Sequence, residues 1–325
     1  MSLYKQKCHS EPERRRISSL WKKYATESKL VSRQVNMQLS KRLQAVADSV
    51  TKGNRVADVG CDHAYISIYL IQHNIAPHVI AMDINKGPLK RGRENIERLG
   101  FSSQIETRLS DGLHQLNPGE ADTILIAGMG GALTVQILEE GLTSVKKCKE
   151  LVLQPQSELF LVRKFIEQIE FEIIAEQMLI DDGKYYTIIK AIPKVLPKEP
   201  PLKVPSLKVP PLKVPSPKVP GTSISVPGTE LTVPDTKTED NDDKVPNTKL
   251  IKVPGTELSE LYYRYGKLLL QQRNPIAKEY LLKEKNLRLQ VIKELEQNLT
   301  ENAIIRLKEV QEELGYIEEG LEYYK

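Results

Sequence analysis

The sequence has few cysteines, few large aromatic residues and no long apolar run. Its three cysteines, Cys8, Cys61 and Cys148, show no CxxC spacing, which argues against a disulfide framework or a cysteine-rich zinc site and favours a reducing cytoplasm. No stretch approaches the roughly 18 apolar residues that a membrane helix needs, and the N-terminus lacks the apolar core of a secretory signal. We therefore expect a cytoplasmic protein with no metal and no membrane partner.

Proline and charge are unevenly spread. Of the 20 prolines, 14 lie between Pro193 and Pro254, in a window without Phe, Trp or Tyr. Because proline removes amide donors, segment 193–258 is expected to be an extended linker of proline-rich repeats. Segment 1–36 has 9 Lys/Arg against 3 Asp/Glu, which is typical of a basic, partly disordered extension. The net charge of +4 permits a polyanionic partner without requiring one.

Residues 37–192 alternate between short apolar runs and helical patterns. Buried parallel strands are predicted at 55–58, 79–83, 105–109, 123–127 and 151–153, with helices at 64–72, 87–99, 131–140 and 158–169. Two further runs, 171–180 and 185–192, flank Asp182-Gly183, a strong hairpin signal. This order predicts a doubly wound α/β domain with a seven-stranded sheet that ends in an antiparallel pair.

Residues 259–325 have a helical pattern in which 11 Lys/Arg nearly balance 12 Asp/Glu. Two apolar stripes are predicted to form the coiled-coil-like seam of an antiparallel helical hairpin. The stripes are Leu282, Leu289, Ile292, Leu295 and Leu299, then Leu307, Val310, Leu314, Ile317 and Leu321. The bend is expected at 300–303.

Carboxylates follow the first three predicted strands. Ligands of open α/β sheets bind at the carboxyl ends of the strands, where Asp58, Asp83 and Asp111 stand. Asp83 is suited to ribose hydroxyls, and a carboxylate at Asp111 can accept an exocyclic amine proton. The first loop, with Gly60 for a tight turn and Asp62 to cap the next helix, is not GxGxxG. An acidic rim disfavours a diphosphate and favours a cationic adenosine ligand, S-adenosylmethionine.

The fourth strand ends in Gly128-Met129-Gly130-Gly131. Bare backbone there lets a planar group lie against the chain. Methyltransferases that act on amines often carry Asn/Asp-Pro-Pro-aromatic at this place, so its absence is suited to a nucleophile without N–H groups. A ring nitrogen with an in-plane lone pair and no proton to lose is such a nucleophile. Methyl transfer to an atom of this kind needs alignment rather than a general base.

Four segments together resemble the bacterial tRNA (adenine-22-N1)-methyltransferase family, TrmK. They are Leu39-Ser40-Lys41-Arg42-Leu43, Ala57 to Tyr65 (ADVGCDHAY), Ala127-Gly128-Met129-Gly130-Gly131 and Leu153-Gln154-Pro155. The order and spacing match over 38–192, and 259–325 resembles the helical domain of the family. Two places depart from the family pattern: Gln156 replaces the usual Asn, and Tyr265-Gly266-Lys267 replaces Tyr-Gly-Pro.

The resemblance implies an S-adenosylmethionine-dependent enzyme that methylates N1 of an adenine in tRNA, at position 22. It implies cofactor contacts from Asp58, Gly60, Asp83, Asp111 and Gly112, to which we add Asp62 and His63. Around the target base it implies Gly128, Met129 and Gly130, with Gln154 and Pro155 beside them. We expect Lys41, Arg42, Arg91 and Arg93 to contact the RNA by charge and shape.

Two alternatives stay open at this point. One keeps the cofactor but acts on another RNA or a small molecule. The other is a non-catalytic RNA-binding protein with a vestigial cofactor site, against which the three acids at strand ends argue. The sequence specifies no oligomeric state, and a monomer is the expectation.

Overall fold

The computed structural model describes residues 38–194, 259–297 and 300–325. The predicted basic extension at 1–36 and all but the first two residues of the predicted proline-rich linker at 193–258 lie outside these residues, so the expectations for them stay predictions. Pro193 itself ends strand β7 (Lys184–Pro193). Within the described part of the chain, no helix has the length and apolar character needed to cross a membrane. Within the same part, no three His, Cys, Asp or Glu side chains cluster as a metal site would require.

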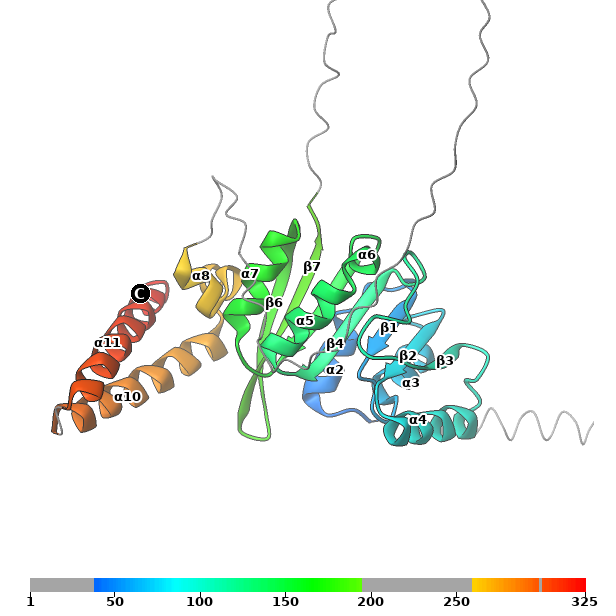
Figure 1. The fold of residues 1–325 in the computed structure, drawn as a ribbon, viewed down its shortest axis with the longest axis horizontal. Helices are drawn as coiled ribbons and strands as arrows, with labels where there is room; N and C mark the ends of the chain where they lie inside the picture. Colours follow the sequence, from blue (N-terminus) through cyan, green and yellow to red (C-terminus); the bar gives the residue numbers. More distant parts are fainter. Residues whose placement is uncertain (1–37, 195–258, 298–299) are drawn as a thin grey trace, which may run out of the picture. The chain divides into compact units, whose positions relative to one another are not determined.

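The predicted seven-stranded sheet is confirmed (Figure 1). Its strands are β1 (Val56–Val59), β2 (Val79–Asp83), β3 (Ile105–Leu109), β4 (Thr123–Met129), β5 (Glu150–Pro155), β6 (Phe171–Asp181) and β7 (Lys184–Pro193). They lie in the order β3-β2-β1-β4-β5-β7-β6, with β1 to β5 parallel and β7 antiparallel to both neighbours. The β6–β7 hairpin turns at Asp182 (φ 48°) and Gly183 (φ 70°), as the Asp-Gly pair predicts.

Helices cover both faces of the sheet because successive strand residues point to opposite sides. Ala57 and Val59 pack in one core with α5 (Gly131–Glu140), α6 (Leu142–Val145) and α7 (Leu159–Gln168). Val56 packs in the other core with α2 (Lys41–Asp48), α3 (Tyr65–Gln72) and α4 (Lys86–Leu99). The continuous apolar strand runs follow from this double coverage.

The helical segment at residues 259–325 packs on the sheet and on α7. It comprises α8 (Glu260–Tyr265), α9 (Lys267–Gln271), α10 (Pro275–Gln297) and α11 (Glu301–Glu322). Arg163 of α7 donates from Nη1 to the carbonyl of Tyr263 at 2.8 Å. Met178 of β6 packs with Leu269 and Ala277. Buried polar and apolar contacts therefore both hold this segment.

The helical hairpin forms, but its seam differs from the predicted one. Thr300 caps α11 by accepting a hydrogen bond from the amide of Ala303 at 3.2 Å, and Val310 and Ile317 are buried as expected. On α10, however, Leu282 and Leu289 are exposed, so these two residues do not form the predicted stripe. Ile292 and Leu295 are half-buried, and Leu299 lies outside the described residues. Leu281 packs with Ile317 instead. Farther along the hairpin, Arg288 of α10 and Glu313 of α11 form an ion pair at 2.6 Å.

Candidate active site

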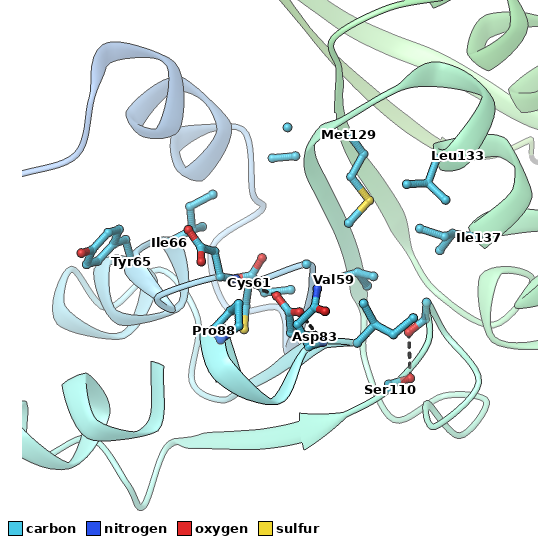
Figure 2. A pocket seen from close by; sticks show the side chains of 18 of the residues that line it. Val59, Cys61, Tyr65, Ile66, Asp83, Pro88, Ser110, Met129, Leu133 and Ile137 are labelled. Carbon is cyan, nitrogen blue, oxygen red and sulfur yellow. Dashed lines mark hydrogen bonds between the residues drawn. The ribbon is translucent and has the colours of Figure 1, made fainter. Parts of the chain in front are cut away.

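A cavity of about 590 Å³ opens at the carboxyl ends of β1 to β4, where an open α/β sheet binds its ligand. Figure 2 shows Met129, Leu133 and Ile137 on one side of it and Tyr65 and Ile66 on the other. Six predicted cofactor residues line it, namely Asp58, Gly60, Asp62, Asp83, Asp111 and Gly112. The seventh, His63, does not belong to the lining.

Asp58 is buried at the end of β1, with 3% of its surface exposed. Its Oδ2 accepts a hydrogen bond from the Ser67 hydroxyl at 2.6 Å. Burial penalises the charged carboxylate and raises the pKa of Asp58 to about 6, partly offset by the bond from Ser67. This group therefore gains or loses its charge near neutral pH, and a cationic ligand would favour its ionised form.

The loop after β1 is held by backbone bonds and left-handed residues. The amides of Gly60 and Cys61 both donate to the carbonyl of Met82, at 2.8 and 2.9 Å. Gly60 has φ 74°, and a Cβ there would clash with the Met129 methyl group. The chain thus needs glycine at this position for its backbone and for the room that Met129 takes.

Asp62 does not cap α3, contrary to the sequence prediction. The residue that precedes the helix is Ala64, with φ 59° and no side-chain cap. Asp62 instead turns toward His63, whose Nδ1 lies 2.8 Å from its Oδ2. Arg91 donates to Nε2 of His63 at 3.0 Å, and the His63 ring stacks on Tyr65 with the centroids 5.2 Å apart. His63 therefore supports Tyr65, which is the ring that lines the cavity.

Asp83 and the Asp111-Gly112 turn complete the acidic rim. Asp83 is nearly buried, and its carboxylate accepts the amides of Asn85 at 2.8 Å and Asp62 at 3.2 Å. The hydroxyl of Ser110 donates to the carbonyl of Gly112 at 2.9 Å and shapes the next turn. Asp111 is exposed within the lining. The three strand-end acids are thus brought together as predicted.

The glycine run at the end of β4 divides between two roles. Gly128 and Met129 line the cavity, at a register shift between Ala127 and Met129. Gly130 precedes α5 and does not line the cavity. A Cβ at Gly131 would clash with the carbonyl of Ser157, so this glycine serves the packing of α5 against the loop after β5.

Gln154 and Pro155, predicted beside the target, are buried and outside the lining. Gln154 acts through Arg42, whose Nη1 donates to its Oε1 at 2.6 Å. Arg42 itself lines the cavity, as does Gln156. The amide of Arg42 donates to Asp181 at 3.1 Å, and its guanidinium lies over the Tyr186 ring, 5.3 Å from the centroid.

Asp181 and Tyr186 were missed by the sequence reasoning. They lie on β6 and β7, and Asp181 is 139 positions from Arg42 in the chain. No local motif marks either residue. The other predicted RNA contacts stay outside the cavity: Lys41 and Arg93 are exposed, and Arg93 donates to Thr107 at 2.9 Å. Arg91 is exposed and holds His63.

The residues that line the cavity fit S-adenosylmethionine. This cofactor carries a sulfonium, an ammonium, two ribose hydroxyls and an adenine amine, all of which pair with carboxylates. Four carboxylates line the cavity, from Asp58, Asp62, Asp83 and Asp111, and their negative charge disfavours a diphosphate. The fold and this cavity define a class I S-adenosylmethionine-dependent methyltransferase.

Comparison with known proteins gives the family. A methyltransferase domain model matches residues 39–189. The tRNA (adenine(22)-N(1))-methyltransferase of Bacillus subtilis is 39% identical over 155 residues, which cover 48% of this chain and 65% of that enzyme. A putative tRNA methyltransferase of Mycoplasma genitalium is 30% identical over 158 residues, covering 46% of this chain and 68% of the relative. The chain belongs to the bacterial tRNA (adenine(22)-N(1))-methyltransferase family.

Solved structures resemble this chain over a longer stretch than the sequence relatives do. The crystal structure of the B. subtilis tRNA methyltransferase TrmK superposes with a TM-score of 0.65 at 25% identity, covering 88% of this chain and all (100%) of that one. A putative tRNA (m1A22) methyltransferase of Streptococcus pneumoniae in complex with S-adenosyl-L-methionine has a TM-score of 0.61 at 25% identity, with coverages of 87% and 100%. The helical segment is therefore included in the likeness.

Proposed function

We propose that this protein transfers a methyl group from S-adenosylmethionine to N1 of an adenine in tRNA, at position 22, in the cytoplasm. Membership of the tRNA (adenine(22)-N(1))-methyltransferase family supports tRNA as the substrate. The observation that carries the chemistry is the glycine turn at Gly128, which meets the carboxylate-lined cavity without presenting a carboxylate of its own. A nucleophile with no proton to lose fits such a turn.

S-adenosylmethionine, when bound, supplies an electrophilic methyl group. Adenine N1 forms the new bond to carbon with its in-plane lone pair as the sulfur–carbon bond breaks, and the positive charge ends on the base. No proton has to leave. The residues of this chain align the two partners and exclude water: Asp58, Asp83 and Asp111 hold the cofactor side, and Gly128 and Met129 border the base.

The RNA has to be held with its adenine turned out of the folded structure, because N1 is covered by pairing or tertiary contacts in tRNA. We assign phosphate contacts to Lys41, Arg91 and Arg93, which are exposed cations on α2 and α4. Tyr65, exposed at 39% and stacked on His63, is placed to contact a base.

Methyl transfer from labelled S-adenosylmethionine to unmodified tRNA transcripts, followed by nucleoside analysis, tests the proposal. We expect 1-methyladenosine as the product. A transcript with adenine 22 replaced by guanine should give none, whereas a transcript with another unpaired adenine replaced should react normally. Methylation of small amines or of other RNA instead would assign a different substrate. Cofactor binding without any transfer to tRNA would contradict the proposal.

A further inference from the structure

Arg42 of α2 is held in place by residues of three strands, β5, β6 and β7. Its amide donates to Asp181 of β6 at 3.1 Å, and its Nη1 donates to Gln154 of β5 at 2.6 Å. Its guanidinium also lies over the ring of Tyr186 on β7. A long side chain fixed by this many contacts loses rotamer freedom before any ligand arrives. The arrangement therefore presents a preorganised cation to the cavity.

Arg42 is also the one cationic side chain among the described residues that line the cavity, which carries four carboxylates. In the described part of the chain, no carboxylate forms an ion pair with its guanidinium. The side chain that accepts its hydrogen bond, Gln154, is neutral. A partly buried guanidinium with donors still available favours an anionic ligand group.

The position of Arg42 along the rim fits one end of the cofactor. Its Nη1 lies 3.6 Å from where a Cβ of Gly128 would stand, at the end of β4. Asp83 and Asp111 stand beyond the other side of β1, after β2 and β3. A ligand with its ribose and adenine at Asp83 and Asp111 would therefore cross β1 at Gly60 and extend its far end toward Arg42.

S-adenosylmethionine has a single anionic group, the α-carboxylate of its methionine part, at the end opposite the adenine. We propose that Arg42 binds this carboxylate and that Gln154 is a positioning residue that orients the guanidinium. This inference rests on the proposed function in that the cofactor is S-adenosylmethionine. It moves Arg42 from the RNA contacts predicted from sequence to the cofactor site.

The test compares two ligands by calorimetry on the full chain: S-adenosylmethionine, and decarboxylated S-adenosylmethionine, which lacks only the carboxylate. We expect Arg42→Gln to weaken binding of the first by about 10- to 100-fold, the range for a lost hydrogen bond to a charged group. Binding of the decarboxylated ligand should be the same in both proteins. Arg42→Lys should fall between them, because the charge stays but the fork geometry is lost.

Arg98→Gln is the matched control, because Arg98 is an exposed arginine of α4 that bonds Asn95 and lies outside the cavity. It should change neither affinity. Equal weakening of both ligands in Arg42→Gln would overturn the inference and make Arg42 structural. Unchanged cofactor affinity, with weaker tRNA binding and a salt dependence reduced by about one phosphate contact, would also overturn it. If the unaltered protein binds neither ligand, the proposed function itself fails.

Discussion

Glu176 of β6 accepts a hydrogen bond from Nε of Arg163 on α7 at 2.8 Å, and both side chains are buried. Arg163 also donates to the carbonyls of Tyr263 and Arg264, at 2.8 and 3.0 Å. A buried charge pair contributes little to stability as a pair, but breaking it is costly. In this protein the pair ties the sheet to the start of the helical segment.

Gly266→Ala should strongly destabilise the protein. Gly266 has φ 83°, and a Cβ there would lie 2.6 Å from Glu176 Oε2 and 2.9 Å from Arg163 Nη2. Disrupting this pair should cost about 3–5 kcal/mol and add to the left-handed backbone cost of about 1 kcal/mol, for a total loss of about 4–6 kcal/mol in the free energy of unfolding. Urea unfolding measures it. Gly100→Ala is the control, with φ 80° and open space around the Cβ; equal losses in the two variants would contradict the role of the pair.

Gly60→Ala should abolish most cofactor binding while changing stability only modestly. The new Cβ would displace the flexible end of Met129, which lies against Gly60. The thioether would then move within the cavity. The backbone cost of φ 74° is about 1 kcal/mol. Gly53→Ala has the same kind of backbone, at φ 92° with no neighbour within 4 Å. Calorimetry should find normal affinity in that control and a large loss in Gly60→Ala; similar affinities would show that Met129 has room to move aside.

Asp83→Ala should weaken cofactor binding by about tenfold or more, the cost of losing a charge-assisted hydrogen bond to a ribose hydroxyl. The carboxylate also holds the amides of Asp62 and Asn85, so part of the loss would come from the loop. Asp83→Asn keeps an acceptor for one amide and separates the two contributions. Affinity for S-adenosylhomocysteine, with circular dichroism to check folding, is the measurement. Unchanged affinity in Asp83→Ala would show that the rim assignment is wrong.

Cofactor affinity should depend on pH through Asp58. Its pKa of about 6 lies above the ordinary value because the side chain is buried. Below that pH the carboxyl is neutral, so affinity for the cationic cofactor should fall by up to about tenfold per pH unit, and it should level off above. Binding near pH 6 should release protons. The comparison is the affinity of Asp58→Asn between pH 5 and 8, which should lack this step; an identical step in both proteins would assign it to another group.

The fold was predictable because its signals are local and repeated. Apolar runs of strand length alternate with helical patterns through residues 55–169, and Asp182-Gly183 marks the hairpin. The acidic rim was also predictable, since the chain places Asp58, Asp83 and Asp111 at strand ends, and the topology brings such ends to one edge.

Two side-chain placements could not be read from the sequence. Asp62 was expected to cap α3 but turns toward His63 instead. His63 was expected at the cofactor, but it lies outside the cavity lining, where Arg91 donates to its ring. Leu282 and Leu289 of the predicted α10 stripe are exposed, because helical spacing alone does not say which side of a charged helix faces its partner.

By itself, the sequence determined the order of strands and helices and the residue types at each strand end, because backbone preference and hydrophobic period act over a few neighbours. The tertiary structure alone decided which of those residues line the cavity. Arg42 and Gln154 are 112 positions apart in the chain, and Arg42 and Asp181 are 139 apart. Their contacts depend on how β5, β6 and β7 lie beside α2, and no local pattern encodes the direction in which a guanidinium points.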